Sequence, residues 1–305
     1  MHTPKSSVFT RALKNTLWSR TLRDKLQMEG INVTPVNFYA TVPSIAEIES
    51  SFEYADGAVP YLDDRLFDHP RMLEQLAELT DYSANFAPDE EGDEETCENG
   101  FFWKNSQFSY SDAMSYYAFV RKLKPGRIVE IGSGFSTLVA ARAVEENGHG
   151  SITCIEPFPR PFLKTLNGIT LIPRKVQDIS ATELDAMLED GDILFIDSTH
   201  TVKTGSDCVH IYLRLLPKLT KTVYVHIHDI FLPFGMPKEW LLDLHIYWTE
   251  QYLVHAWLLD NPRATVLYGS CYHEHFSREA LTAFMHGRAL AGGSSLWLKY
   301  DGPRR

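Results

Sequence analysis

The sequence predicts an α/β fold in which a largely parallel sheet carries helices on both faces. From about residue 106 onward, short apolar segments alternate with helical patterns, and such unbroken apolar runs are typical of strands buried on both sides. Polar residues follow several of these segments directly, at the edge of the sheet where ligands bind in open parallel folds. The composition is that of a globular protein, with 44% hydrophobic and 23% charged residues in a chain of 305.

Residues 1–105 are expected to form a mainly helical appendage. Apolar residues recur at i+4 spacing near its start, which predicts an amphipathic helix: Phe9, Leu13, Leu17, Trp18, Leu22 and Leu26. Five basic residues and no acid lie between His2 and Arg23. We expect this helix to dock on the body or on a second subunit, as in a homo-oligomer; a membrane-surface helix or a transit peptide has the same composition and ranks lower. Ser44 and Glu47 have the spacing of a capping box.

The appendage ends in an acidic segment, in which seven of the ten residues from Asp89 to Glu98 are acidic. A solvated loop is expected there, because the alternation and the glycine of a calcium-binding EF-hand are absent. With a net charge of −11 and no basic stripe, the chain is not expected to bind nucleic acid. No apolar run reaches the roughly 18 residues of a membrane helix. The four scattered cysteines have no C-x-x-C spacing, so a cytoplasmic protein with reduced thiols is expected.

The body is expected to span residues 106–305. Ser109 and Asp112 are placed to cap its first helix, which Pro125 and Gly126 would stop. Seven strands are predicted, over residues 127–131, 152–155, 169–172, 193–196, 222–227, 264–268 and 296–300. Helices are predicted between them, over residues 136–144, after a cap at Ser180, and over residues 209–216.

A glycine-containing turn follows the first strand, where residues 130–137 read Glu-Ile-Gly-Ser-Gly-Phe-Ser-Thr. Gly132 and Gly134 allow a tight turn and a close approach of the backbone to a ligand, because no Cβ intrudes. Glu156 follows Gly134 by 22 residues and ends the next strand, where an acid can accept hydrogen bonds from both ribose hydroxyls. The two glycines and Glu156 belong to one strand–helix–strand unit, and this combination predicts a nucleoside-binding site.

The nucleoside is expected to be S-adenosylmethionine rather than NAD. A dinucleotide fingerprint reads G-x-G-x-x-G, but Thr137 stands at the third glycine position. The acid before the turn, Glu130, would repel a pyrophosphate and would suit a cation. S-adenosylmethionine carries a sulfonium and an amino group and has no phosphate.

These motifs resemble those of class I S-adenosylmethionine-dependent methyltransferases. Four local sequences resemble those of a bacterial subgroup related to macrocin-type sugar O-methyltransferases and cephalosporin-hydroxylase-like proteins. They lie at residues 129–137, 194–200, 226–230 and 248–252. The resemblance covers about residues 105–300. It implies a Rossmann-like, seven-stranded sheet in the order 3-2-1-4-5-7-6, with the seventh strand antiparallel.

The resemblance also implies a cofactor site. The turn would face the methionine moiety, Glu156 the ribose, and Gln177 with Asp178 the adenine edge, while Asp197 would begin the acceptor side. The expected cofactor-binding residues are Glu130, Gly132, Ser133, Gly134, Ser136, Thr137, Glu156, Gln177, Asp178 and Asp197.

Two carboxylates and two imidazoles follow strands that are expected to be neighbours: Asp197, His200, His228 and Asp229. Methyl transfer to oxygen needs the nucleophile held close to the methyl group and its proton removed. The resemblance implies that Asp197 and Asp229 hold Mg²⁺ and that His200, with an ordinary pKa near 6.5, is the general base. His228 stands where the related enzymes have a carboxylate. Mg²⁺ prefers oxygen ligands, so a softer metal at Asp197, His228 and Asp229, or no metal with a structural His228, stays open.

The expected function is S-adenosylmethionine-dependent methylation of a hydroxyl on a small polar acceptor, such as a sugar or natural product, with His200 and Asp197 as catalytic residues. A divalent cation such as Mg²⁺ is a candidate second cofactor. Three alternatives stay open: an NAD-linked oxidoreductase, a non-catalytic binding module, and a metal-dependent hydroxylase on the same scaffold.

Overall fold

The computed structural model describes residues 8–288 and 290–303. By its internal contacts the chain divides into two units, Met1–Ser51 and Phe52–Arg305. Residues 52–105, which we assigned to the appendage, therefore pack within the larger unit, and a domain boundary near residue 105 stays a prediction. None of the helices in the described ranges has the length and hydropathy needed to cross a membrane.

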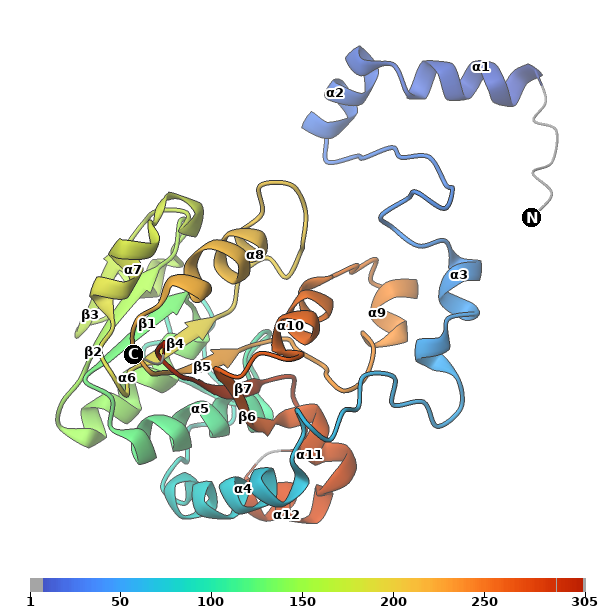
Figure 1. Ribbon diagram of the computed structural model, residues 1–305. Helices are drawn as coiled ribbons and strands as arrows, with labels where there is room; N and C mark the ends of the chain where they lie inside the picture. Colours follow the sequence, from blue (N-terminus) through green and yellow to red (C-terminus); the bar gives the residue numbers. More distant parts are fainter. Residues whose placement is uncertain (1–7, 289, 304–305) are drawn as a thin grey trace. The chain divides into compact units, whose positions relative to one another are not determined.

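The described part of the smaller unit contains the helices α1 (Val8–Leu17), α2 (Arg20–Met28) and α3 (Ile45–Glu49) (Figure 1). The expected amphipathic helix is interrupted, because the Ser19 hydroxyl accepts a hydrogen bond from the Leu22 N–H and starts a new helix. Lys5, one of the basic residues counted above, lies outside the described residues. The capping box at Ser44 and Glu47 is confirmed, with both of its hydrogen bonds formed.

One seven-stranded sheet forms the centre of the larger unit, in the order β3-β2-β1-β4-β5-β7-β6. The strands are β1 (Arg127–Ile131), β2 (Ser151–Ile155), β3 (Ile169–Ile172), β4 (Ile193–Ile196), β5 (Val223–Ile227), β6 (Ala264–Gly269) and β7 (Leu296–Tyr300). The first five run parallel, and β7 runs antiparallel to both β5 and β6. The predicted strand order is confirmed.

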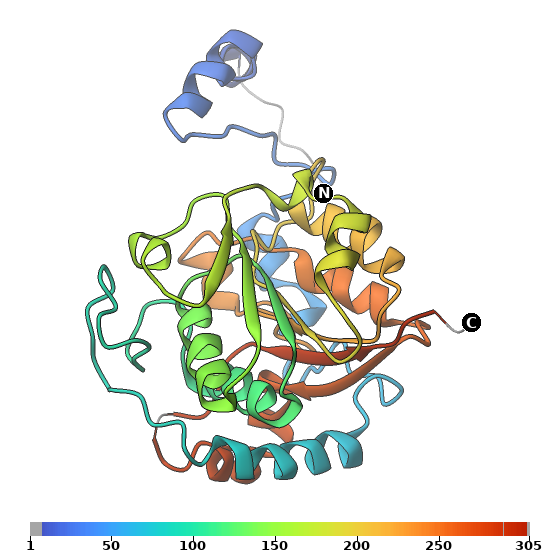
Figure 2. The same cartoon turned by 90° about the vertical axis from the view of Figure 1, so that its left-hand side faces the viewer.

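The sheet is buried on both faces, as its apolar strands predict (Figure 2). Along β4, Ile193 and Phe195 belong to one hydrophobic cluster, whereas Leu194 and Ile196 belong to the other, because successive side chains of a strand point to opposite faces. The remaining α-helices of this unit are α4 (His69–Ser83), α5 (Tyr110–Leu123), α6 (Phe135–Asn147), α7 (Ala181–Met187), α8 (Asp207–His210), α9 (Lys238–Leu242), α10 (Glu250–Leu258), α11 (Ser270–Phe276) and α12 (Arg278–Phe284).

One helical prediction needs correction. The helix expected over residues 209–216 is α8 followed by a π-helical turn over Ile211–Leu215. The aromatic-rich stretch from Trp240 to Trp257 forms α9 and α10 with an irregular segment between them.

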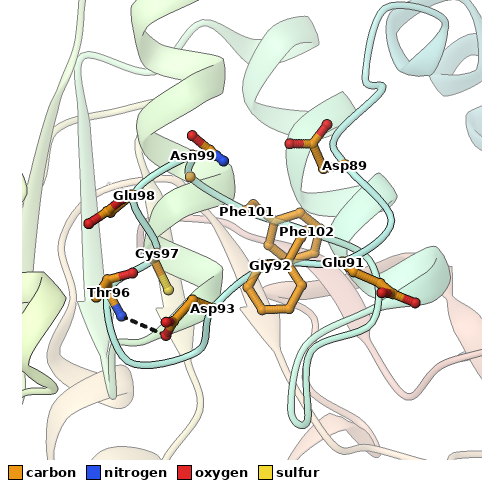
Figure 3. Close-up of a pocket in the computed structure, with 11 residues that line it drawn as sticks. Asp89, Glu91, Gly92, Asp93, Thr96, Cys97, Glu98, Asn99, Phe101 and Phe102 are labelled. Atoms are coloured by element: carbon orange, nitrogen blue, oxygen red, sulfur yellow. Dashed lines mark hydrogen bonds between the residues drawn. The ribbon is translucent and has the colours of Figure 1, made fainter.

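The acidic segment is exposed, as expected, and it is also ordered by local bonds (Figure 3). The Asp93 carboxylate accepts hydrogen bonds from two backbone N–H groups, and Glu91 pairs with Lys104 at 2.8 Å. A Cβ on Gly92 would lie 2.3 Å from the Phe102 ring. The loop therefore needs glycine at this position to pack on Phe102.

Candidate active site

A cleft of about 1030 Å³ opens where several strands end. Its wall includes residues that directly follow four of them: Gly132 after β1, Glu156 after β2, Asp197 after β4 and His228 after β5. The strand order reverses between β1 and β4, and this switch point is where open α/β sheets bind ligands.

The two glycines of the turn have different physical roles. Gly132 has a φ of +82°, and a Cβ there would lie 1.7 Å from the backbone oxygen of Asp197. The turn after β1 is therefore packed directly on the main chain that follows β4. Gly134 lines the cleft, and apart from its two neighbours in the chain no described residue has an atom within 4 Å of the position its Cβ would take. A ligand in the cleft can thus approach the backbone at Gly134.

Glu130 lies beneath this turn and is not one of the residues that line the cleft. It is fully buried, and its carboxylate accepts hydrogen bonds from the Tyr116 hydroxyl at 2.9 Å and the Thr137 hydroxyl at 2.6 Å. The Thr137 oxygen in turn accepts the Gly134 N–H at 3.2 Å. In this structure Glu130 and Thr137 therefore support the shape of the turn, and their direct contact with a cofactor stays a prediction.

The other expected cofactor residues differ in position. Ser133, Ser136 and Glu156 line the cleft, and the Glu156 carboxylate accepts the Phe158 N–H at 2.7 Å. Gln177 and Asp178 are exposed and do not line the cleft. Their expected place at the adenine edge stays a prediction.

Asp197, His200, His228 and Asp229 converge, and we call these four residues the imidazole–carboxylate cluster. His200 Nε2 lies 3.1 Å from Asp197 Oδ1 and 3.6 Å from Asp229 Oδ2. His228 Nδ1 lies 3.5 and 3.6 Å from the same two oxygens. Donor atoms of Asp197, His200 and Asp229 all lie within 4.8 Å of one another, which suits a metal ion. The sequence prediction that these residues meet in one cleft is confirmed.

In each imidazole, the nitrogen that faces away from Asp197 and Asp229 (the outer nitrogen) is hydrogen-bonded to a buried carboxylate. Glu250 Oε2 lies 2.8 Å from His200 Nδ1, and the other Glu250 oxygen accepts the Tyr212 hydroxyl at 2.7 Å. Asp112 Oδ2 lies 3.2 Å from His228 Nε2. The sequence analysis missed both carboxylates as functional residues, although Glu250 lies in a segment that carries the family resemblance.

Residues 129–230 match a protein-family model described as a methyltransferase domain. The match begins in β1 and ends just past β5, so it spans the glycine turn and the whole imidazole–carboxylate cluster. The strand order, with its antiparallel β7, is that of the class I enzymes. Residues 129–230 of this chain form a methyltransferase domain.

Known proteins similar to this methyltransferase include an uncharacterized protein of Archaeoglobus fulgidus, which is 29% identical over 169 residues that cover 51% of this chain and 73% of that protein. Among solved structures, an O-methyltransferase of Bacillus cereus in complex with SAH is 14% identical, with a TM-score of 0.40, over 75% of this chain and 90% of that one. TomG of Streptomyces achromogenes, an O-methyltransferase involved in tomaymycin synthesis and in complex with SAM, is 15% identical, with a TM-score of 0.39 and the same coverage. The narrower resemblance to macrocin-type enzymes stays a prediction.

The electrostatics of the methyltransferase cleft differ from what ordinary pKa values predict. Burial lowers the pKa of an imidazole, but the hydrogen bonds that the His200 ring donates to Asp197 and Glu250 outweigh it and raise the pKa of His200 to about 10. Burial likewise opposes the ionisation of Asp197, yet His228 and His200 hold its pKa well below its usual range. Without a metal, His200 therefore carries a proton at neutral pH, and Asp197 is ionised.

An aromatic wall adjoins the cluster and consists of Phe231, Trp240 and Trp248, all of which line the methyltransferase cleft. The Trp248 ring lies 4.3 Å from the His200 ring, and Trp240 packs edge-on against both Trp248 and Phe231. His226, which lies in β5, is fully buried and stacks on Trp297.

Proposed function

We propose that this methyltransferase transfers the methyl group of S-adenosylmethionine to a hydroxyl of a small polar acceptor. One observation carries the proposal: a single cleft joins the glycine turn and Glu156, on one side of the switch point, to the imidazole–carboxylate cluster on the other. Its volume of about 1030 Å³ lies at the upper end of the usual range of about 300–1,000 Å³ for small-molecule sites. The cleft can therefore hold a cofactor and a small acceptor together.

The residues of the turn fit the cofactor. The space in front of the Gly134 backbone is open, and a Cβ at this position would fill part of it. The methionine moiety of the cofactor would lie against this backbone. Glu156, with its carboxylate in the cleft wall, would accept the ribose hydroxyls. When bound, S-adenosylmethionine supplies an electrophilic methyl group on a cationic sulfur.

The acceptor side supports transfer to oxygen, because an attacking hydroxyl must lose its proton. Asp197 is ionised and partly exposed to the cleft, so it can accept a hydrogen bond from this hydroxyl, but its lowered pKa makes it too weak a base to remove the proton alone. His200 carries a proton of its own in the metal-free protein and would first donate a hydrogen bond to the acceptor oxygen. Its predicted role as general base requires that a cation offset the carboxylates that raise its pKa.

A divalent cation, which the family resemblance implies, fits the donor atoms of the cluster. Asp197, Asp229 and an imidazole would hold it, and when bound it supplies positive charge that lowers the pKa of a coordinated hydroxyl. The aromatic wall faces the same part of the cleft and suits the apolar face of a ring-shaped acceptor such as a sugar.

Thermal unfolding of the full chain with S-adenosylhomocysteine, with NAD in parallel, tests this function. A ligand at about 100 times its dissociation constant stabilises a fold by roughly 2.7 kcal/mol. Stabilisation by the homocysteine nucleoside, followed by transfer of a labelled methyl group to one of a panel of polyhydroxylated small molecules, is the expected result. Stabilisation by NAD alone would instead favour an oxidoreductase, and no response to either ligand would favour a binding module.

A further inference from the structure

We propose that Asp197, His200, His228 and Asp229 form one site for a divalent transition metal such as Zn²⁺ or Co²⁺, and that Glu250 and Asp112 position its two imidazoles. The proposal rests on the proposed function only in placing this metal on the acceptor side of the methyltransferase cleft. It differs from the Mg²⁺ site that the family resemblance implies, because both imidazoles are ligands.

The nitrogen–oxygen distances across the cluster are close to those of a tetrahedral metal site. Ligand atoms about 2.1 Å from a tetrahedral Zn²⁺ lie about 3.4 Å from one another, and the four nitrogen–oxygen distances here are 3.1, 3.5, 3.6 and 3.6 Å. Donor atoms of Asp197, His200 and Asp229 already lie within 4.8 Å of one another, whereas His228 lies outside that group. The His228 ring would therefore shift toward the other three ligands to complete the coordination.

His228 is the independent observation that points to a ligand. Its side chain is 5% exposed, and Nδ1 forms no hydrogen bond within the described part of the chain. This nitrogen nevertheless faces the same two carboxylate oxygens as His200 Nε2 does. A buried nitrogen without a partner is costly, and a metal ion between it and the two oxygens would satisfy it.

The outer nitrogens have the partners that metal-binding histidines need. A ligating histidine almost always donates its second ring N–H to a carboxylate, a carbonyl or water, which sets the tautomer and aims the free nitrogen at the metal. Glu250 and Asp112 take this place at 2.8 and 3.2 Å. Asp112 is itself fixed, because it accepts the Ser294 and Ser295 N–H groups and the Ser270 hydroxyl.

The charge of the cluster also calls for a cation. The two carboxylates of the cluster, together with Glu250 and Asp112, surround its two imidazoles, and no lysine or arginine pairs with these four carboxylates among residues 8–288 and 290–303. Negative charge would therefore remain even if both rings were protonated, and buried charge without compensation is unfavourable. Imidazole suits Zn²⁺, Co²⁺, Ni²⁺ and Cu²⁺, whereas Mg²⁺ prefers oxygen ligands.

Metal titration of the chelator-treated full chain tests the site directly. We expect Zn²⁺ and Co²⁺ to bind with a stoichiometry of one and at least about 100-fold more tightly than Mg²⁺, as measured by calorimetry. Bound Co²⁺ should show the visible absorption of a site with nitrogen ligands. Binding of Mg²⁺ as tight as that of Zn²⁺, or no stoichiometric binding of Zn²⁺ and Co²⁺, would overturn the proposal and leave a proton-bridged ion-pair network.

Two variants test the positioning residues. Glu250→Gln and Asp112→Asn should each lower Co²⁺ affinity by about 10- to 100-fold and should alter the cobalt spectrum. Glu274→Gln is the matched control, because Glu274 lines the same cleft without contacting the cluster, and it should leave both readouts unchanged. Unchanged affinity and spectrum in both folded variants would contradict the roles of Glu250 and Asp112.

S-adenosylhomocysteine binding, measured on the same samples, separates this proposal from the proposed function. Metal binding without nucleoside binding would refute the methyltransferase assignment and leave the metal site. Nucleoside binding without metal binding would do the reverse. The titration of the unaltered chain also decides the question if a variant fails to fold.

Discussion

Replacing Gly134 by aspartate should abolish cofactor binding without harming the fold. Gly134 precedes α6 with a φ of −173°, which is extended backbone that any residue adopts, and apart from its chain neighbours its Cβ would meet no described residue within 4 Å. Aspartate is also a good N-cap, and a negative charge at a helix N-terminus contributes about 0.3–1 kcal/mol. The melting temperature of Gly134→Asp should therefore stay the same or rise by up to about 4 °C.

The affinity for S-adenosylhomocysteine should fall sharply in the same variant, because the new side chain fills the space in which a ligand meets the backbone. We expect a loss of at least about 100-fold, or roughly 2.8 kcal/mol, by calorimetry. Gly126→Ala is the control: this glycine precedes β1 at the other end of the strand, and a Cβ there meets Asp192 at an ordinary 3.5 Å. Wild-type affinity in folded Gly134→Asp would refute the placement of the cofactor.

Three further predictions follow from the site and its surroundings. His200→Ala should leave nucleoside affinity intact and lower the rate of methyl transfer by about 10²- to 10⁴-fold; full activity would remove His200 from the reaction. Burial raises the pKa of Glu130 from 4.5 to about 7, so its stabilising contribution is present below pH 4.5 and is lost as the pH rises through 7. Denaturant unfolding should show Glu130→Gln losing this pH dependence, which amounts to roughly 3 kcal/mol. Gly92→Ala should destabilise the protein by about 1–3 kcal/mol in the same assay, because its Cβ would overlap the Phe102 ring; an unchanged midpoint would show that the ring moves aside.

The strands were the most predictable part of this fold. Ile193–Ile196 is an unbroken apolar run, and all four of its residues are buried, so the hydrophobic pattern and the strand coincide. The order of the strands followed from the family motifs rather than from the pattern, because pairing between distant segments leaves no local signal. The meeting of Asp197 with Asp229 was predictable because the strands that precede them are adjacent in that order.

The partners of the two imidazoles could not be predicted locally. From their spacing, Ser109 and Asp112 were expected to cap the helix together. The Ser109 hydroxyl makes no capping bond, however, and instead donates to the Trp103 carbonyl. The Asp112 carboxylate binds His228, which lies 116 positions away in the chain. The pKa of His200 could not be predicted locally either. An ordinary imidazole pKa suggested a general base, but the hydrogen bond to Glu250, 50 positions away, helps to raise the pKa so that the ring is a cation.

The contact of Gly132 with the Asp197 backbone oxygen has a consequence for how this enzyme can be altered. Because a Cβ at Gly132 would overlap the Asp197 backbone oxygen, and the Asp197 N–H donates to the Ile131 carbonyl at 2.9 Å, two main-chain contacts help to fix the spacing between the glycine turn and the segment that follows β4. Substitutions in the aromatic wall, for example at Trp240, can therefore change which acceptor is taken while the methyl donor stays in place. Directed evolution of acceptor preference should concentrate on that wall and leave the turn intact.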